Sequence, residues 1–208
     1  MFTDTLLAGT ASQRGHKFAQ VFATSYGWSR TITMTNKSDA PFSLVRVIRY
    51  EGVPPEIIMD GSKEQNLGDF ARKLRNYGCH RNQIEPHSPW MNLCEGEIRE
   101  LKRGSTRKML KRNVPKKLWD HCLELESRIR SDTTLPRFDL DHHNPETKIH
   151  GMSSDISDIC EFEFYEWVMF NDSRAPFREN KFHVGRWLGP AVDVGSALTY
   201  KILKSNGQ

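Results

Sequence analysis

The sequence predicts an α/β layer fold followed by a small β-rich module at its carboxyl end. Three observations support this prediction. Strand-like segments occupy residues 1–36, helical patterns alternate with short strands up to residue 132, and a strictly alternating apolar segment covers residues 162–168. Strands that come first and then alternate with helices are typical of a sheet covered by helical layers.

The first predicted elements are two strands and a helix. Residues 18–23 and 31–35 are rich in β-branched and aromatic side chains, which favours strands. The polar segment 36–39 offers a helix start, and Gly52 with the two prolines after it ends that helix. The positions at helical spacing between these limits are Phe42, Val45, Ile48 and Arg49.

Short strands then alternate with helices. Residues 56–60 predict a short apolar strand that ends in a carboxylate, and residues 82–85 predict a second short strand. The helix predicted between them carries Leu67, Phe70, Leu74 and Tyr77. A long helix begins at about Met91, and Pro115 opens a further helix. The apolar face of that last helix is Leu118, Cys122, Leu125 and Ile129.

The carboxyl-terminal part changes in composition. Residues 133–159 are rich in Pro, Asp, His, Ser and Asn, which predicts a linker. Residues 162–168, 182–187 and 199–203 then predict strands of a small antiparallel module. We therefore divide the chain into a core with trailing helices at 1–132, the linker, and a β module at 160–208.

Composition excludes several classes of protein. The 208 residues include 37% hydrophobic and 27% charged residues, and no stretch approaches the ~20 apolar residues of a membrane span. The amino terminus shows no signal-peptide pattern. The four cysteines are far apart and form no Cys-x-x-Cys pair, which indicates reduced thiols and an intracellular protein. We predict no membrane partner.

Positive charge is concentrated in the middle of the chain. The net charge is only +4, but Glu100 is the only acid among nine basic residues between Arg99 and Lys117. Such asymmetry predicts a face that binds a polyanion. The candidate contacts are Arg99, Lys102, Arg103, Arg107, Lys108 and Lys111.

Three carboxylates are candidates for a metal site. Asp4 lies in or beside the first strand, Asp60 ends a later strand, and Glu95 lies early in the long helix. Strand ends and helix starts can converge at one edge of an α/β sheet. Phosphoryl transfer by two Mg²⁺ or Mn²⁺ ions about 3.5–4 Å apart uses such hard oxygen ligands. From their spacing alone, the simpler interpretation of these three residues is that they are solvated carboxylates on the protein surface.

The surrounding motifs add to this reading over about residues 1–112. The chain resembles the integrase of copia-type LTR retrotransposons, a member of the RNase H-like superfamily of retroviral integrases. The segments that carry the resemblance are Thr3-Asp4-Thr5, Ser12-Gln13-Arg14-Gly15, Ser29-Arg30, Lys37-Ser38-Asp39, Met59-Asp60-Gly61-Ser62-Lys63-Glu64, Ser88-Pro89-Trp90-Met91-Asn92 and Glu95-Gly96-Glu97-Ile98-Arg99-Glu100-Leu101-Lys102.

The resemblance implies an RNase H-like core with a mixed five-stranded sheet flanked by helices. It also implies that Asp4, Asp60 and Glu95 bind Mg²⁺ or Mn²⁺ and catalyse DNA 3′-end processing and strand transfer. The basic run would hold element and target DNA. A multimer that acts in the nucleus, after a stage in the cytoplasm or a virus-like particle, would follow from membership of this family.

The chain departs from the family pattern before the third carboxylate. Trp90 stands where glutamine is usual, and only two residues separate Asn92 from Glu95. Glu97 is therefore the alternative third residue, although Glu95 places Arg99 and Lys102 on one helical face with it. Two other functions share these motifs: a catalytically silent DNA-binding remnant of a retroelement, and an RNase H-like nuclease.

Overall fold

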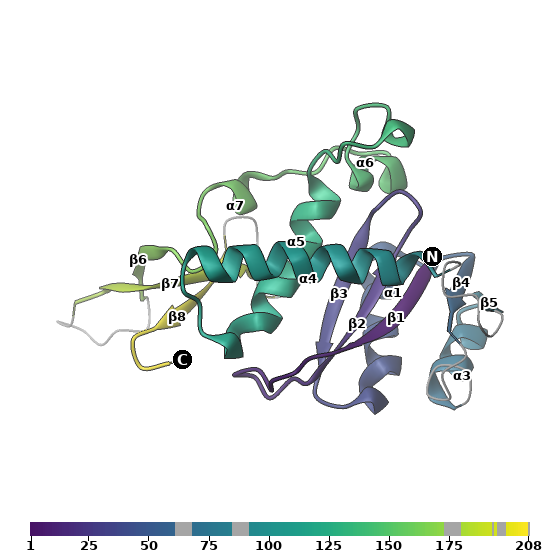
Figure 1. The fold of residues 1–208 in the computed structure, drawn as a ribbon, viewed down its shortest axis with the longest axis horizontal. Coiled ribbons are helices and arrows are strands. Elements are labelled where there is room, and N and C mark those ends of the chain that lie inside the picture. Colours follow the sequence, from purple (N-terminus) through teal and green to yellow (C-terminus); the bar gives the residue numbers. More distant parts are fainter. Residues whose placement is uncertain (61–67, 85–91, 173–179, 193, 195–198, 208) are drawn as a thin grey trace.

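A five-stranded mixed sheet forms the centre of the computed structural model (Figure 1), which describes residues 1–60, 68–84, 92–172, 180–192, 194 and 199–207. The sheet order is β3-β2-β1-β4-β5. β2 pairs antiparallel with β1 and β3, whereas β4 pairs in parallel with β1 and β5. The strands are β1 Phe2–Leu7, β2 Phe18–Ala23, β3 Ser29–Met34, β4 Glu56–Met59 and β5 His80–Gln83. The predicted mixed five-stranded sheet is confirmed.

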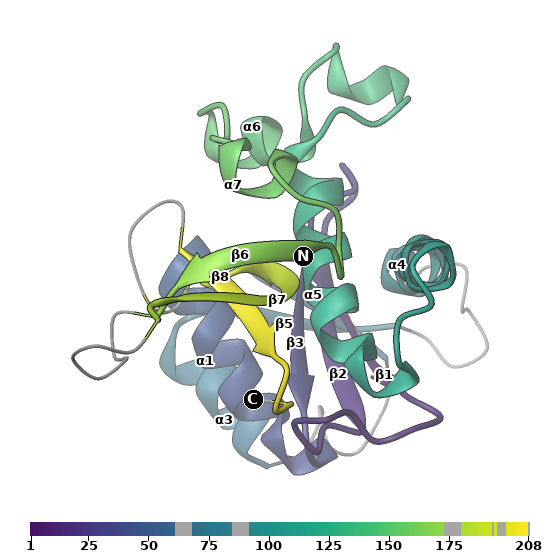
Figure 2. The ribbon, with the colours of Figure 1, turned by 90° about the vertical axis from the view of Figure 1, so that its left-hand side faces the viewer.

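Helices cover both faces of this sheet (Figure 2). On one face, α1 (Ala40–Glu51), which follows the 3₁₀ turn η1 (Lys37–Asp39), and α3 (Asp69–Asn76) share a core with the sheet. On the other face, α4 (Leu93–Lys111) packs with α5 (Trp119–Asp132), which follows η3 (Lys116–Leu118). Two hydrophobic layers therefore enclose the sheet, as an α/β layer fold requires.

The buried face of α1 differs from the predicted one. The core side is formed by Leu44, Val47 and Ile48, whereas Phe42 is 71% exposed. The ring of Phe42 lies instead beside the ammonium group of Lys73 on α3, 5.8 Å from it. Helical spacing is compatible with either face, the one that contains Phe42 or the one that contains Leu44 and Val47. Packing against the sheet buries the second face and leaves Phe42 exposed.

The carboxyl-terminal residues form a second, three-stranded antiparallel sheet with the order β6-β7-β8. Its strands are β6 Trp167–Asn171, β7 Phe182–Pro190 and β8 Tyr200–Lys204, so the predicted β-rich module is confirmed. The predicted strand at 162–168 is wrong in its bounds, because the chain turns at Tyr165 with a φ of 67°. Phe164 is buried in the core beneath the module instead of lying in a strand.

Helix α5 joins this module to the core. Leu118 at the end of η3, together with Cys122 and Leu125 of α5, packs with Trp187 and Leu188 of β7. The opposite side of the same helix lies against β3 and α4 (Figure 2). The small sheet is thus held on the core by a continuous apolar cluster that includes a helix of the core.

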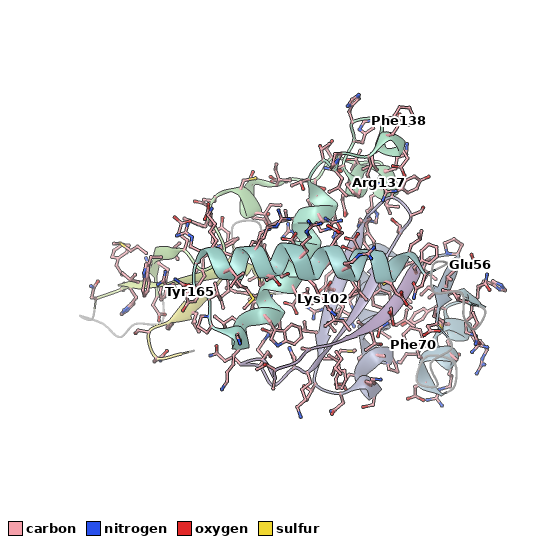
Figure 3. The ribbon with its side chains drawn as sticks, viewed as in Figure 1. Glu56, Phe70, Lys102, Arg137, Phe138 and Tyr165 are labelled. Carbon is pink, nitrogen blue, oxygen red and sulfur yellow. The ribbon has the colours of Figure 1, made fainter. Side chains whose placement is uncertain are left out.

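Residues 133–159, for which we predict a linker, contain η4 (Phe138–Leu140), α6 (Pro145–His150) and α7 (Ser157–Cys160). Asn144 Nδ2 donates a hydrogen bond to the carbonyl of Asp132 at the end of α5, at 2.9 Å, and Arg128 of α5 pairs with Asp158 of α7. Phe138, which is fully exposed, lies at the outer end of this segment (Figure 3). The limits of the three predicted domains stay a prediction.

Two further expectations concern membrane-spanning helices and the cysteine thiols. Among the described residues, no helix has both the length and the apolarity that crossing a bilayer requires. All four cysteines are free, and Cys79, Cys94 and Cys122 are buried. Burial raises the pKa of the Cys122 thiol to about 12, so this side chain packs as a neutral group between α4 and α5.

Close packing of α4 on α5 gives a test of the fold. A Cβ at Gly104 of α4 would overlap with Oε1 of Glu126, a buried carboxylate of α5 that pairs with Lys108. Gly104→Ala therefore requires the buried Glu126 side chain to shift, which disturbs its contact with Lys108. We expect the free energy of unfolding to fall by about 1–3 kcal/mol in denaturant titrations.

Gly96 provides the matched control, because it lies in the same helix and a Cβ there meets no described heavy atom within 4 Å. Gly96→Ala should raise the free energy of unfolding by up to about 1 kcal/mol through helix propensity. Equal stability changes in the two variants would contradict the close approach of α4 to α5.

Candidate functional site

Asp4 and Asp60 lie side by side at the centre of the sheet. Asp4 is in β1, opposite Val21 of β2, on the face that α4 covers. The parallel register pairs Thr3 with Met59, so Asp60, the next residue after β4, is level with Asp4. Because alternate residues of a strand face opposite sides, the register assigns both carboxylates to the face of α4.

The first turn of α4 is fixed beside Asp4. The side chain of Asn92 caps the helix and accepts a hydrogen bond from the N–H of Cys94 at 3.1 Å. The fully buried Cys94 thiol donates to the carbonyl of Val21, the residue paired with Asp4, at 3.4 Å. Burial raises the pKa of this thiol well above its usual range, so it remains a neutral donor. Glu95 follows in the same turn and is exposed.

The three carboxylates are electrostatically coupled. The pKa of Asp4 is raised, first because its carboxylate is desolvated and then because the charges of Asp60 and Glu95 repel it. The N–H of Thr5 donates to Oδ1 of Asp4 at 2.6 Å and opposes this rise, as does the charge of Lys37. A divalent cation would relieve both the repulsion and the desolvation, so this set of hard oxygen donors fits Mg²⁺ or Mn²⁺.

Glu97, the alternative third carboxylate, is engaged elsewhere. Its two oxygens accept from Nε and Nη2 of Arg130 on α5, at 2.8 and 3.1 Å. The hydroxyl of Ser29 lies 3.4 Å from Glu97 Oε1 as well. Glu97 does point inward, but it joins α4 to α5 and β3. Glu95 is the carboxylate of α4 whose charge acts on Asp4.

Two features of this region were not predicted from the sequence. Lys37, in the turn η1 before α1, acts on Asp4 electrostatically although it lies 33 residues away in the chain. Arg130 neutralises Glu97 from another helix. Neither residue lies at a helical or strand spacing from its partner, so no sequence pattern marks them. The motif residues 61–64 and 88–91 lie outside the described part of the chain.

The basic residues of α4 form two groups. Arg99, Lys102, Arg103 and Arg107 are exposed (Lys102 is labelled in Figure 3), and we call them the basic face of α4. They recur at three- and four-residue intervals, so they share one side of the helix. Arg103 lies 3.8 Å from Glu100. No acid among the described residues forms an ion pair with the other three of them.

The second group already has acidic partners. Lys108 pairs with Glu126, and Lys111 contacts Glu163 at 2.8 Å. Arg112 contacts the same carboxylate at 2.7 Å, and these two cations lower the pKa of Glu163 to about 2. Lys108 and Lys111 therefore contribute to the junction between α4, α5 and the segment before β6. Contact with a polyanion would have to compete with these pairs.

Comparison with known proteins gives matches in structure alone. No protein-family model and no curated protein matches the sequence. Among solved structures, the chain is similar to the intasome of simian T-cell lymphotropic virus in complex with PP2A regulatory subunit B56 gamma. That match has a TM-score of 0.59 and 12% identity, and it covers 90% of this chain and 68% of the other.

Two isolated integrase catalytic cores are similar as well. The BIV core matches with a TM-score of 0.52 and 11% identity, over 71% of this chain and 91% of its own. The HTLV-2 core, in complex with magnesium and in a trimeric form, matches with a TM-score of 0.53 and 13% identity, over 72% and 93%. The chain therefore has the fold of retroviral integrase catalytic cores.

Removing the charge of Asp4 should stabilise the protein in the absence of metal. A carboxyl group whose pKa is raised by folding destabilises the folded state at pH values above that pKa. We expect Asp4→Asn to raise the melting temperature in EDTA at pH 7 by about 2–4 °C, which corresponds to ~1 kcal/mol in a chain of this size.

The difference in melting temperature between Asp4→Asn and the unaltered protein should shrink as the pH falls through the raised pKa. Asp4 then becomes protonated in the folded state, and at still lower pH in the unfolded state as well, so its charge no longer opposes folding. Asp141→Asn, at a side chain that is 77% exposed, is the control and should change the melting temperature little. A lower melting temperature for Asp4→Asn at pH 7 would show that its charge is not a cost to folding.

Proposed function

We propose that this chain is the catalytic core of a copia-type retrotransposon integrase, which processes DNA 3′ ends and joins them to target DNA. One observation carries the proposal. Asp4 on a central strand is coupled to Asp60 and Glu95, in a chain with an integrase core fold. The likeness in structure supports the fold, and the motifs around these residues support the more specific assignment.

In this proposal, Asp4, Asp60 and Glu95 hold two Mg²⁺ or Mn²⁺ ions. When bound, such ions activate the attacking oxygen and stabilise the leaving oxygen of an in-line displacement at phosphorus. The protein positions the ligands. The Thr5 N–H fixes one oxygen of Asp4, and the anchored turn of Asn92 and Cys94 places Glu95 next to β1. The magnesium in the similar HTLV-2 structure is consistent with this choice of metal.

The basic face of α4 supplies the DNA contacts in this proposal. It begins one turn beyond Glu95 and extends along the same helix for a further two turns. Guanidinium and ammonium groups there would contact phosphates without reading base sequence. DNA held along α4 would be led to the three carboxylates at the start of that helix.

Assembly as a multimer on both DNA ends belongs to the same proposal, as does action in the nucleus after a cytoplasmic or particle stage. The intasome and the trimeric core among the similar structures support a multimer.

A strand-transfer assay tests the catalytic assignment. A labelled duplex with the element's terminal sequence is incubated with plasmid DNA and Mg²⁺ or Mn²⁺. We expect joined products with the unaltered protein, and a loss of at least ~100-fold with Asp60→Asn or Glu95→Gln, because each removes a ligand oxygen charge. Activity that survives Asp60→Asn would refute the carboxylate assignment.

Glu97→Gln is the matched control for Glu95→Gln. It weakens the contact with Arg130 but leaves Glu95 in place, so it should lower the melting temperature and retain joining below that temperature. The reverse pattern would make Glu97 the third ligand. Cleavage without joining would indicate an RNase H-like nuclease, and DNA binding without either reaction would indicate a silent remnant.

Salt dependence of DNA binding tests the basic face separately. For duplex DNA, the slope of log affinity against log salt is about −0.9 for each phosphate contact. Arg99→Ala, Lys102→Ala and Arg107→Ala should each weaken binding and reduce the slope by about 0.9. Lys111→Ala should have a smaller effect, since Glu163 already neutralises that ammonium group. Equal effects of all four substitutions would contradict the division into two groups.

A further inference from the structure

A second group of possible metal ligands lies away from the three carboxylates. Glu51 is the last residue of α1, and Glu146 and His150 lie one turn apart on α6. All three line a cavity of about 510 Å³ bounded by β3, α1, α5 and the end of β7. We propose that Glu51, Glu146 and His150 form a binding site for a divalent transition-metal ion such as Zn²⁺.

The donor atoms converge on one point. Nε2 of His150 lies 3.1 Å from Oε2 of Glu51 and 3.4 Å from Oε1 of Glu146. The three atoms all lie within 4.8 Å of one another. Nε2 is buried, yet it makes no hydrogen bond of acceptable geometry, even with these two oxygens near it. Three possible ligand atoms therefore meet at one point, and a cation placed among them would give Nε2 a partner.

These separations agree with tetrahedral coordination. Zinc binds histidine nitrogen and carboxylate oxygen at about 2.0–2.2 Å, so two ligands of one tetrahedral ion are roughly 3.3–3.6 Å apart. The two contacts of His150 lie close to that range before any adjustment of the side chains. One imidazole with two carboxylates favours a transition ion over Mg²⁺, which prefers oxygen ligands alone.

The other oxygen of each carboxylate is already held. Arg30 donates from Nε to Oε1 of Glu51 at 2.8 Å and from Nη2 to Oε2 of Glu146 at 2.9 Å. The indole N–H of Trp28 donates to the same oxygen of Glu146 at 2.6 Å. Each carboxylate is thus oriented by one oxygen and offers the other to the site. Outer contacts of this kind orient the ligands in protein metal sites.

The charges also permit an ion. Arg30 neutralises one of the two carboxylates in the absence of metal, so a divalent ion would leave the group with one net positive charge. The adjoining cavity can supply water or an anion as the fourth ligand. α1 and α4 cover opposite faces of the sheet, so this site is distinct from Asp4, Asp60 and Glu95 (Figure 2).

A bound ion would fasten the 133–159 segment to the core. The amino-terminal end of α6 is fixed locally, because the side chain of Asn144 accepts a hydrogen bond from the N–H of Thr147 at 2.7 Å. The metal would add a bond from α6 to the end of α1, beside the hairpin between β2 and β3 (Figure 1). The site therefore has a structural role in this proposal, and it does not depend on the proposed function.

Metal titration of the whole chain tests the proposal. The background carries Asp4→Asn and Asp60→Asn, so that binding at those carboxylates is removed. Zn²⁺ should raise the melting temperature and change the fluorescence of Trp28, whose N–H contacts Glu146. Co²⁺ in place of Zn²⁺ should give the intense visible absorption of tetrahedral coordination. His150→Gln should weaken binding at least ~100-fold, more than loss of an outer contact does.

His143→Gln is the matched control, because this exposed histidine lies in the same segment and should leave the affinity unchanged. Glu146→Gln gives a second, conservative test if His150→Gln unfolds the protein, and the cobalt spectrum requires no substitution at the site. Absence of a zinc-induced shift, a Co²⁺ spectrum without tetrahedral character, or equal affinities for His150→Gln and His143→Gln would each overturn the proposal.

Discussion

Burial of α5 on two sides is the constraint on which the rest of the structure depends. Toward the sheet, Ser131 donates to the carbonyl of Ser29 and accepts from its N–H, both at 2.8 Å. Toward the module, apolar residues of the same helix form a core with β7. An unpaired polar group is costly on either side of a helix buried between two layers, and these contacts pair both backbone groups of Ser29. The helix therefore fixes the edge strand β3, the position of α4 and the docking of the small sheet together.

Charged groups along α5 are matched for the same reason. Asp120 is fully buried and is met by Arg14 at 2.7 Å and His16 at 3.1 Å from the loop between β1 and β2. The guanidinium group outweighs burial and lowers the pKa of this carboxyl group. At the other end, Arg130 neutralises Glu97 of α4. Breaking one partner of such a pair is costly because it leaves a buried charge, so these contacts define one arrangement of the helices.

The candidate catalytic carboxylates are the exception to this matching. Burial of the Asp4 carboxylate and repulsion from Asp60 and Glu95 raise the pKa of Asp4, and the charge of Lys37 opposes this rise. The packing of α4 offsets the free-energy cost of this repulsion, because Asn92 and Cys94 hold the first turn of the helix in place. Repulsion held in place by surrounding structure is typical of functional sites, since a cation or substrate can relieve it. The cluster of Glu51, Glu146 and His150 differs, because Arg30 already balances much of its charge.

The mixed sheet was predicted from the resemblance of the motifs to a known family. The sequence by itself determined the order of strands and helices up to residue 132 and the positions of Asp4 and Asp60 at strands. These follow from local patterns: β2 lies where its side chains favour a strand, and β4 ends where its apolar run ends. Only the tertiary structure decided which face of α1 is buried, where the chain turns at Tyr165, which basic residues of α4 remain exposed, and how α6 meets α1. Each of these depends on a partner distant in the chain, such as Lys73, Trp187, Glu163 or Glu51. The periodicity of a segment shows which faces it could bury. Which face is buried, and against which partner, depends on contacts that form only when the layers of the fold pack together.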